Sequence, residues 1–177
     1  MNIKLLVLDV DGTLTDGKIY MSANGELMKA FNIKDGYVLA HLREYGIEPV
    51  IITGRESEIV KQRCKELKIT ELHQRIDNKL YKLKEICDKS GIGLNNVAYI
   101  GDDVNDLPCI QQCGCTACPS DAMKSVKEKV SYICETKGGE GAVREFVDYL
   151  LSNQTKEDNI ECNFQEVKYE IDTNIND

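Results

Sequence analysis

Short apolar runs alternate with longer amphipathic segments along most of the chain. The first run, residues 3–8, has the length of a buried strand. Further strand-like runs follow at 48–53, 69–72, 97–101, 113–117 and 130–134. Segments with helical spacing lie between or after them at 35–45, 56–67, 78–89, 105–112, 121–128 and 141–151. This alternation predicts an α/β fold with a Rossmann-like, doubly wound parallel sheet covered by helices on both faces.

One segment departs from this alternation. Two short runs, 18–21 and 26–31, flank the residues Ser22-Ala23-Asn24-Gly25. Asn-Gly between two strand-like runs is a strong hairpin signal. The segment 17–31 therefore predicts a β-hairpin flap that projects from the sheet just after the first strand.

The composition changes after Leu151. Residues 152–177 are polar and acidic and show little periodicity. We expect a folded domain at 1–151 and a mobile C-terminal tail at 152–177, with a short strand at 164–171.

Length and charge narrow the class of protein. The chain has 177 residues, 42% of them hydrophobic, and a net charge of −8. This size suits one core, and the negative charge argues against a nucleic-acid partner. The sequence shows neither an apolar run of membrane-spanning length nor a leader, so we expect no membrane segment and a cytoplasmic location.

Four of the eight cysteines lie close together, at Cys109, Cys113, Cys115 and Cys118. They do not form two separated C-x-x-C pairs, the usual spacing of a zinc site. Cys113 and Cys115 alternate along the predicted strand 113–117, where small apolar residues belong. We therefore expect free buried thiols in a reducing compartment rather than a metal centre.

The most informative polar residues follow the first apolar run. Asp9 and Asp11 are two positions apart, so both side chains lie on one side of an extended segment. Gly12 and Thr13 bend the chain and offer backbone N–H groups to an anion. Two carboxylates this close need a cation or a shared proton. The pair suits covalent phosphoryl transfer, in which one Asp attacks phosphorus, the other handles the leaving-group proton, and Mg²⁺ offsets the charges.

Other predicted strand ends carry residues of matching chemistry. In open α/β sheets, ligands bind beyond the carboxyl ends of the strands. A hydroxyl and an ammonium suit phosphate oxygens, and clustered carboxylates suit Mg²⁺. The residues are Thr53, Gly54 and Arg55 after the second strand, Lys79 at the start of a helix, and Asp102, Asp103 and Asp106 after the strand at 97–101.

Four motifs in this order resemble those of the haloacid dehalogenase superfamily. They are D-x-D-G-T at 9–13, the hydroxyl of Thr53, Lys79, and G-D-D-x-x-D at 101–106. Within this superfamily, the dehalogenases and P-type ATPases lack an Asp at the place of Asp11. Its presence here is similar to the phosphatases and phosphomutases. The intervals from Asp9 to Thr53 and from Thr53 to Lys79 are too short for a cap domain. The open site then needs a macromolecular substrate or a neighbouring subunit as its lid.

Longer stretches resemble the 3-deoxy-D-manno-octulosonate 8-phosphate phosphatase family over residues 3–151. They read L-T-D-G, F-N-I-K-D-G-Y, I-I-T-G-R, N-K-L, G-D-D-V-N-D-L-P and G-G-E-G-A-V-R-E-F. The resemblance implies a capless homotetramer that hydrolyses a small-molecule sugar phosphate, a 2-keto-3-deoxy sugar acid phosphate, through an aspartyl-phosphate. Two alternatives remain, a phosphatase of a nonulosonate (sialic acid/KDN) 9-phosphate and a non-catalytic oligomerisation module. A module is expected to lose motif residues, and this chain keeps them all.

The resemblance also implies a role for each motif residue. Asp9 would be the nucleophile and Asp11 the general acid/base. Asp9, the Asp11 carbonyl and Asp102 would bind Mg²⁺, with Asp103 in support, while Thr53 and Lys79 would hold the phosphoryl group. Arg55, next to Gly54, would contact the sugar acid, and Arg63 would join it. From the residues alone, both arginines fit a solvated helix charge equally well.

Overall fold

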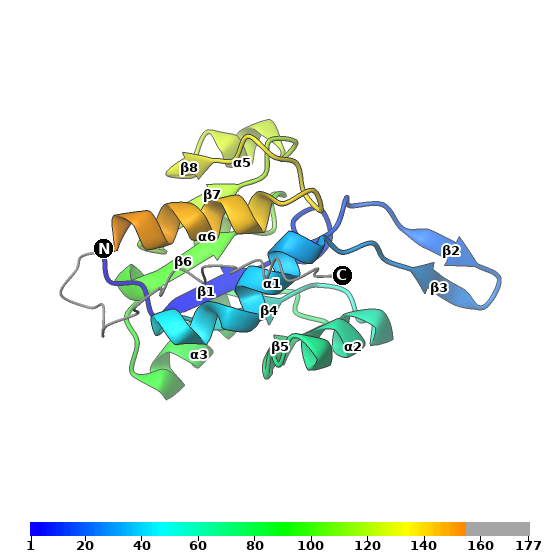
Figure 1. The fold of residues 1–177 in the computed structure, drawn as a ribbon, viewed down its shortest axis with the longest axis horizontal. Coiled ribbons are helices and arrows are strands. Elements are labelled where there is room, and N and C mark those ends of the chain that lie inside the picture. Colours follow the sequence, from blue (N-terminus) through cyan, green and yellow to red (C-terminus); the bar gives the residue numbers. More distant parts are fainter. Residues whose placement is uncertain (155–177) are drawn as a thin grey trace, which may run out of the picture.

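A six-stranded parallel sheet forms the centre of the computed structural model, which describes residues 1–154 (Figure 1). The strand order is β5-β4-β1-β6-β7-β8, and every neighbouring pair is parallel. This arrangement confirms the predicted doubly wound sheet. The strands are β1 (Leu5–Leu8), β4 (Glu48–Ile52), β5 (Glu71–His73), β6 (Val97–Ile100), β7 (Cys115–Cys118) and β8 (Tyr132–Ile133).

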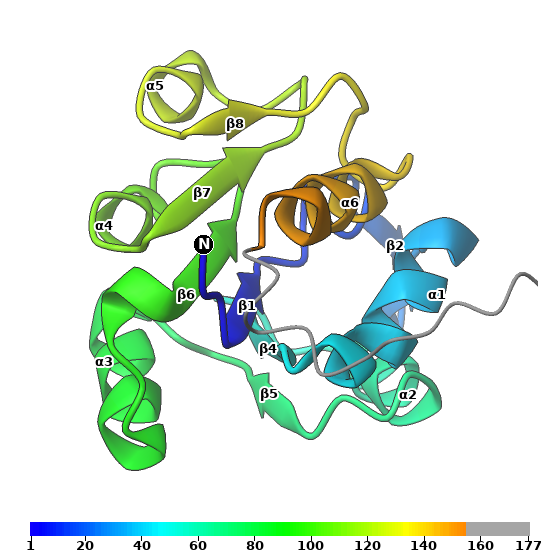
Figure 2. The same cartoon turned by 60° about the vertical axis from the view of Figure 1, so that its left-hand side comes forward.

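Helices cover both faces of the sheet (Figure 2). One face carries α1 (Ile33–His41), α2 (Glu58–Glu66) and α6 (Ala142–Asn153). The other carries α3 (Lys79–Ser90), α4 (Leu107–Ile110) and α5 (Lys124–Lys127). Two 3₁₀ turns, η1 (Leu42–Tyr45) and η2 (Leu94–Asn96), complete the connections. No helix within residues 1–154 is long and apolar enough to cross a bilayer.

The position of β1 in the middle of the sheet explains why its sequence lacks polar residues. Leu6 and Leu8 pack into the core beneath α1 and α6, whereas Leu5 and Val7 pack into the core beneath α3 and α4. All four side chains are buried because helices cover both faces. A continuous apolar run is the pattern that such a strand requires.

Side-chain caps set the starts of the three long helices before α6. Asn32, Ser57 and Asn78 each accept a hydrogen bond from a backbone N–H in the first turn of α1, α2 and α3. The predicted helix 56–67 therefore begins only at Glu58. At the other end, Gly91 adopts a left-handed conformation and ends α3.

The strand predicted at 113–117 starts two residues later, at Cys115, and ends at Cys118. The Cys113 N–H donates to the Cys109 carbonyl and closes a turn after α4, and the Gly114 N–H donates to the carbonyls of Leu94 and Val97. β7 therefore starts at Cys115. The interpretation that Cys113 and Cys115 alternate along one strand was wrong, because a local turn competes for the Cys113 N–H.

The predicted flap is confirmed as an antiparallel hairpin, β2 (Tyr20–Ser22) and β3 (Gly25–Met28), which projects from the body (Figure 1). Ser22 pairs with Gly25, so two residues form the turn. The hairpin leaves four apolar side chains 48–61% exposed, those of Ile19, Met21, Leu27 and Met28.

The loop before α6 packs directly on the loop that follows β1. The Gly139 N–H donates to the Thr13 carbonyl at 3.1 Å. A Cβ on Gly138 would lie 1.9 Å from the Gly12 carbonyl oxygen, so only glycine permits this approach. The buried Asp35 of α1 accepts a hydrogen bond from the Arg144 N–H in the first turn of α6. Burial raises the pKa of Asp35 to about 6.

The described part of the chain ends just beyond α6, which runs to Asn153 and so passes the expected domain boundary at Leu151. The rest of the predicted tail, including the strand predicted at 164–171, lies outside the described residues. The division into 1–151 and 152–177 stays a prediction.

We predict that Gly138→Ala destabilises the protein by about 1–3 kcal/mol, because the new methyl group overlaps backbone that cannot move aside. Denaturant unfolding would measure this loss. Gly93→Ala is the matched control, since a Cβ there meets only the Asn96 side chain at 3.9 Å. Equal stability of the two variants would contradict the tight contact.

Candidate active site

The candidate site lies at the carboxyl ends of β1, β4 and β6, as the sequence predicts. Asp9 follows β1, and its N–H donates to the Ile100 carbonyl at the end of β6. The Thr53 N–H donates to the His73 carbonyl at the end of β5. These strand-end hydrogen bonds bring residues that are far apart in the sequence to one edge of the sheet.

Three carboxylates meet at this edge. Asp9, Asp102 and Asp106 each offer an oxygen, and the three oxygens lie within 4.8 Å of one another. The Lys79 ammonium lies 2.7 Å from Asp9 Oδ1 and 2.7 Å from Asp106 Oδ1. Three carboxyl groups thus face the ammonium of Lys79, and a divalent cation would offset their charge when all three are ionised.

The pKa values of the site reflect this crowding. Burial and the charge of Asp106 raise the pKa of Asp9 to about 6, although Lys79 opposes the shift. Burial and the charges of Asp9 and Asp106 raise the pKa of Asp102 to about 7. Burial alone would lower the pKa of Lys79, but the two carboxylates that it contacts raise it overall.

Gly12 allows the loop after β1 to approach this carboxylate group. Its φ is +93°, and a Cβ there would lie 2.1 Å from Asp102 Oδ2. The Thr13 hydroxyl donates to Asp102 Oδ1 at 3.1 Å. Hard oxygen ligands at this spacing fit Mg²⁺. Asp9 and Asp102 therefore sit where the sequence predicts a magnesium site.

Asp106 organises the site more than the sequence indicated. It is fully buried, and its Oδ1 accepts hydrogen bonds from Lys79 and from the Tyr99 hydroxyl, both at 2.7 Å. Its Oδ2 accepts from the N–H groups of Asp102 and Asp103. The signal for this role is the spacing of three and four residues, which suits a carboxylate that caps its own loop. Tyr99 gave no such signal because it lies in an apolar strand.

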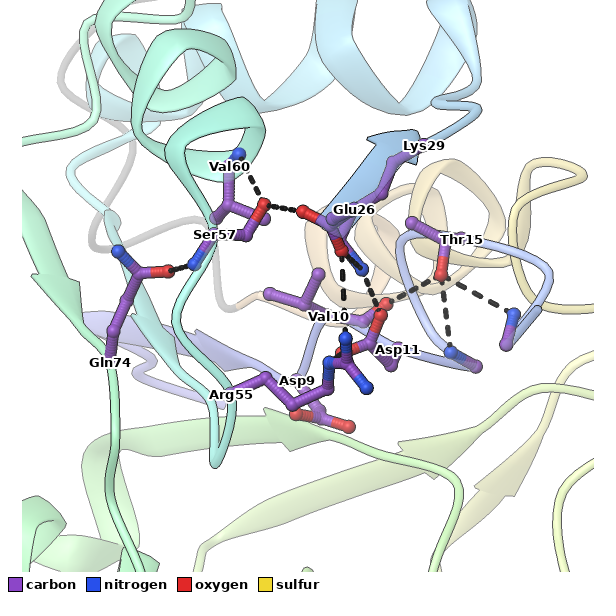
Figure 3. Close-up of polar contacts among 12 residues, drawn as sticks. Asp9, Val10, Asp11, Thr15, Glu26, Lys29, Arg55, Ser57, Val60 and Gln74 are labelled. Atoms are coloured by element: carbon purple, nitrogen blue, oxygen red, sulfur yellow. Dashed lines mark hydrogen bonds and ion pairs between the residues drawn. The ribbon is translucent and has the colours of Figure 1, made fainter. Parts of the chain in front are cut away.

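Asp11 turns toward the flap, whereas Asp9 turns toward Lys79. Lys29, at the end of the hairpin, forms an ion pair with Asp11 Oδ1 and another, at 3.1 Å, with Glu26 Oε1 (Figure 3). The Arg55 Nε lies 3.7 Å from Asp11 Oδ2. The sequence gives no signal for Glu26 and Lys29, because nothing local shows that the hairpin folds these side chains back over the strand ends.

Arg63 does not join Arg55. Its Nη2 donates to the Asn32 carbonyl at 3.4 Å, its Nη1 pairs with Glu66 at 2.9 Å, and its guanidinium stacks over Phe31. These contacts do not include Arg55, and the predicted substrate contact of Arg63 stays a prediction. The rotation of α2 about its axis directs Arg63 toward the start of α1.

Two other predicted residues show no contact that requires their proposed role. Asp103 is exposed, lies outside the three-carboxylate group, and accepts a hydrogen bond from the Val104 N–H. A Cβ on Gly54 would meet the Ile76 carbonyl oxygen at 3.8 Å, an ordinary contact. Thr53 is buried at the end of β4, in the predicted position.

The seven cysteines within residues 1–154 are free, and all except Cys113 are buried. Burial raises the pKa of Cys109 to about 12 and that of Cys118 to about 11. Thiols with such pKa values are poor nucleophiles at neutral pH. The expectation of free buried thiols is confirmed for this part of the chain, with Cys113 as the partly exposed exception.

Comparison with known proteins extends these observations. The profile of the haloacid dehalogenase-like hydrolases matches residues 68–146. The chain is 45% identical over 157 residues to 3-deoxy-D-manno-octulosonate 8-phosphate phosphatase KdsC of Escherichia coli K12, which covers 89% of this chain and 84% of the relative.

Solved structures show the same likeness. The crystal structure of 3-deoxy-D-manno-octulosonate 8-phosphate phosphatase from Yersinia pestis matches with a TM-score of 0.83 and 42% identity, over 85% of this chain and 82% of that one. The Moraxella catarrhalis phosphatase of the same name, solved with magnesium, phosphate and KDO, has a TM-score of 0.83 and 40% identity, over 86% of this chain and 88% of that one.

We predict that the carboxylate group makes the metal-free protein less stable as pH rises. The folded-state pKa of Asp102 is about 7 and its ordinary value is 3.8, so its ionisation opposes folding increasingly across this range. Asp102→Asn should then be more stable than the wild type by about 1–3 kcal/mol near pH 8 in EDTA. Thermal unfolding near pH 5 and pH 8 would measure the difference.

With Mg²⁺ near pH 8, the wild type should become more stable than Asp102→Asn. The cation offsets the carboxylate charges of the wild type, whereas the variant offers it one ligand fewer. The exposed Asp88→Asn is the control and should follow the wild type. An equal gain from Mg²⁺ in all three proteins would contradict a cation site at Asp102.

Proposed function

Because the chain belongs to the 3-deoxy-D-manno-octulosonate 8-phosphate phosphatase family of the haloacid dehalogenase-like hydrolases, we propose that it is a Mg²⁺-dependent phosphomonoester hydrolase acting on that sugar acid phosphate. The observation that carries the proposal is the buried contact of Lys79 with Asp9 beside Asp102 and Asp106. This group can hold both a phosphoryl group and a cation. The alternative of a nonulosonate 9-phosphate is not favoured, since the relatives are named for the octulosonate 8-phosphate. A non-catalytic module is also not favoured, because Asp9, Asp102 and Asp106 come together at one site.

In the proposed reaction, Asp9 attacks phosphorus. Lys79 occupies Oδ1 of Asp9, so the attack falls to Oδ2. The bond from phosphorus to the sugar oxygen breaks, Asp11 gives its proton to the leaving alkoxide, and an aspartyl-phosphate remains on Asp9. Asp11 then takes a proton from water, which attacks phosphorus, releases inorganic phosphate and restores Asp9.

Asp9, Asp102 and the Asp11 carbonyl are the proposed magnesium ligands, and Asp103 is assigned a supporting role. Bound Mg²⁺ would neutralise the carboxylates and the phosphoryl oxygens together. The Moraxella catarrhalis relative, solved with magnesium, phosphate and KDO, supports this assignment. Thr53 and Lys79 are the proposed contacts of the phosphoryl group.

Arg55, beside Gly54, is the proposed contact for the sugar acid. Its side chain is 42% exposed and lies on the flap side of Asp11. A guanidinium there suits a carboxylate. Arg63 is not part of this proposal, because it is engaged by Asn32 and Glu66. We assign the reaction to the cytoplasm, which the free thiols fit.

We predict Mg²⁺-dependent phosphate release from 3-deoxy-D-manno-octulosonate 8-phosphate, with a higher kcat/KM than for a nonulosonate 9-phosphate. EDTA should abolish it, and Asp9→Asn should reduce it to a trace because an amide cannot form the acyl-phosphate. A colorimetric phosphate assay over both substrates measures this. Preference for the 9-phosphate would refute the substrate assignment, and an active Asp9→Asn would refute the nucleophile.

The proposal includes a homotetramer. The flap exposes Ile19, Met21, Leu27 and Met28, which need burial. Residues 1–154 contain no cap domain, and phosphoryl transfer benefits from a site that excludes water. A neighbouring subunit would cover the flap and close the site, and the sugar end of the substrate would then meet Arg55 near the subunit boundary.

We predict that sedimentation at assay concentration shows a tetramer and that Met21→Lys, which places a charge in the flap surface, dissociates it with loss of activity. Ile133→Lys on the edge strand β8 is the control, since that side chain is comparably exposed at 48% and lies away from the flap. A fully active monomer would contradict a site shared between subunits.

A further inference from the structure

Glu26 joins the flap to the body of the protein through two residues of the body, Ser57 and Arg55 (Figure 3). Its Oε2 accepts a hydrogen bond from the Ser57 hydroxyl, and its Oε1 lies 3.1 Å from the Lys29 ammonium. The same oxygen lies 3.8 Å from Arg55 Nη2. Ser57 is a firm anchor, because its hydroxyl also caps α2 through the Val60 N–H and its own N–H donates to Gln74.

Lys29 links the anchored Glu26 to Asp11. Its side chain is only 2% exposed, and its ammonium contacts Asp11 Oδ1 on one side and Glu26 on the other. Burial alone would raise the pKa of Glu26, but the hydrogen bonds from Ser57 and Lys29 lower it overall, so Glu26 is ionised and holds Lys29 as an ion pair.

A hairpin that projects from the body does not need buried charges for its own stability. Buried ionic groups cost free energy unless each has a partner. Here the partner of Lys29 outside the flap is the carboxylate that the proposed reaction uses as acid and base. The flap therefore places its buried charges where they act on Asp11.

The two carboxylates of D-x-D-G-T consequently have separate ammonium partners. Asp9 contacts Lys79, which comes from α3, and Asp11 contacts Lys29, which comes from the flap. Asp9 is thereby held with Asp102 and Asp106, and Asp11 is held apart from that group. A carboxylate that transfers protons has to keep its oxygens out of the metal site, and the Lys29 contact holds the Asp11 side chain on the flap side, outside the three-carboxylate group.

We propose that Lys29 and Glu26 are positioning residues for proton transfer: Lys29 holds the Asp11 carboxylate away from the three-carboxylate group and toward the leaving oxygen, and Glu26 fixes Lys29. The proposal rests on the acid/base role of Asp11 in the proposed function. In this proposal the flap does more than cover the site, because its contacts with the body also set the position of Asp11.

The test uses the full-length protein with two substrates of different leaving group, 3-deoxy-D-manno-octulosonate 8-phosphate and p-nitrophenyl phosphate. Lys29→Met should lower kcat for the sugar phosphate by about 10–100-fold, the scale of a misplaced reacting group. It should lower turnover of p-nitrophenyl phosphate much less, because nitrophenolate leaves without a proton. Lys29→Arg should restore most of the loss.

Two further variants make the test specific. Lys18→Met is the matched control, since Lys18 lies at the start of the flap, pairs with Asp16 and has a side chain 71% exposed, so it should behave as wild type. Glu26→Gln keeps the size of the side chain and removes its charge, and it should show the leaving-group pattern of Lys29→Met more weakly. If Lys29→Met does not fold, as judged by its Tm, Glu26→Gln carries the same comparison.

A double-mutant cycle gives the decisive result. Because Lys29 acts through Asp11, Lys29→Met should cause no further loss in an Asp11→Asn background. Equal losses on both substrates, or additive losses in the double variant, would overturn the proposal and leave Lys29 a structural role.

The cycle also separates this proposal from the proposed function. The wild type must hydrolyse the sugar phosphate, and Asp11→Asn must lose about 10²–10⁴-fold on it, with a smaller loss on p-nitrophenyl phosphate. If either fails, the acid/base assignment is refuted. If both hold and Lys29→Met behaves as Lys18→Met, only the positioning role is refuted.

Discussion

The buried ammonium of Lys79 is the interaction on which the site depends. It lies between Asp9 after β1 and Asp106 after β6, at 2.7 Å from each, and it belongs to the first residue of α3. Three elements distant in the sequence are thus held by one charge. Removing it would leave the carboxylates of Asp9 and Asp106 without their cationic partner, and breaking a buried ion pair in this way costs about 3–5 kcal/mol in comparable cases. The same contact that assembles the site also restrains the fold, so stability and chemistry share one residue.

Close backbone contacts hold the loop after β1 on the side away from Lys79. Gly12 passes against Asp102, and Gly138 passes against Gly12, in positions where a side chain would overlap neighbouring atoms. Asp35 accepts the Arg144 N–H and ties the first turn of α6 to α1. The loop is therefore enclosed between a charged contact and a steric one. Such a site can crowd carboxylates at the strand ends because the surrounding backbone cannot relax away from them.

The sequence predicted the sheet and the placement of the motifs because both follow from local rules. A run such as Leu5–Leu8 is apolar throughout only when both faces are covered, and parallel strands bring their carboxyl ends to one edge. Asp9, Asp102 and Lys79 therefore converge as expected. The helix predicted at 78–89 is also found, although it begins one residue later because Asn78 caps it from outside.

The parts that escaped prediction depend on how elements are oriented in space. Arg63 lies on a helix whose axial rotation is set by packing on α1, and no periodicity reveals which neighbour a half-buried position meets. Lys29 and Glu26 are ordinary charges on a strand until the hairpin folds back over Asp11. The common cause is that strand ends have a fixed geometry, whereas a hairpin or a helix face obtains its partners only from tertiary packing. The residues proposed to hold the phosphoryl group follow a strand end, like Thr53, or begin a helix, like Lys79, and they can be read from the sequence. The residues proposed to position Asp11 lie on the flap, and only the folded structure shows them.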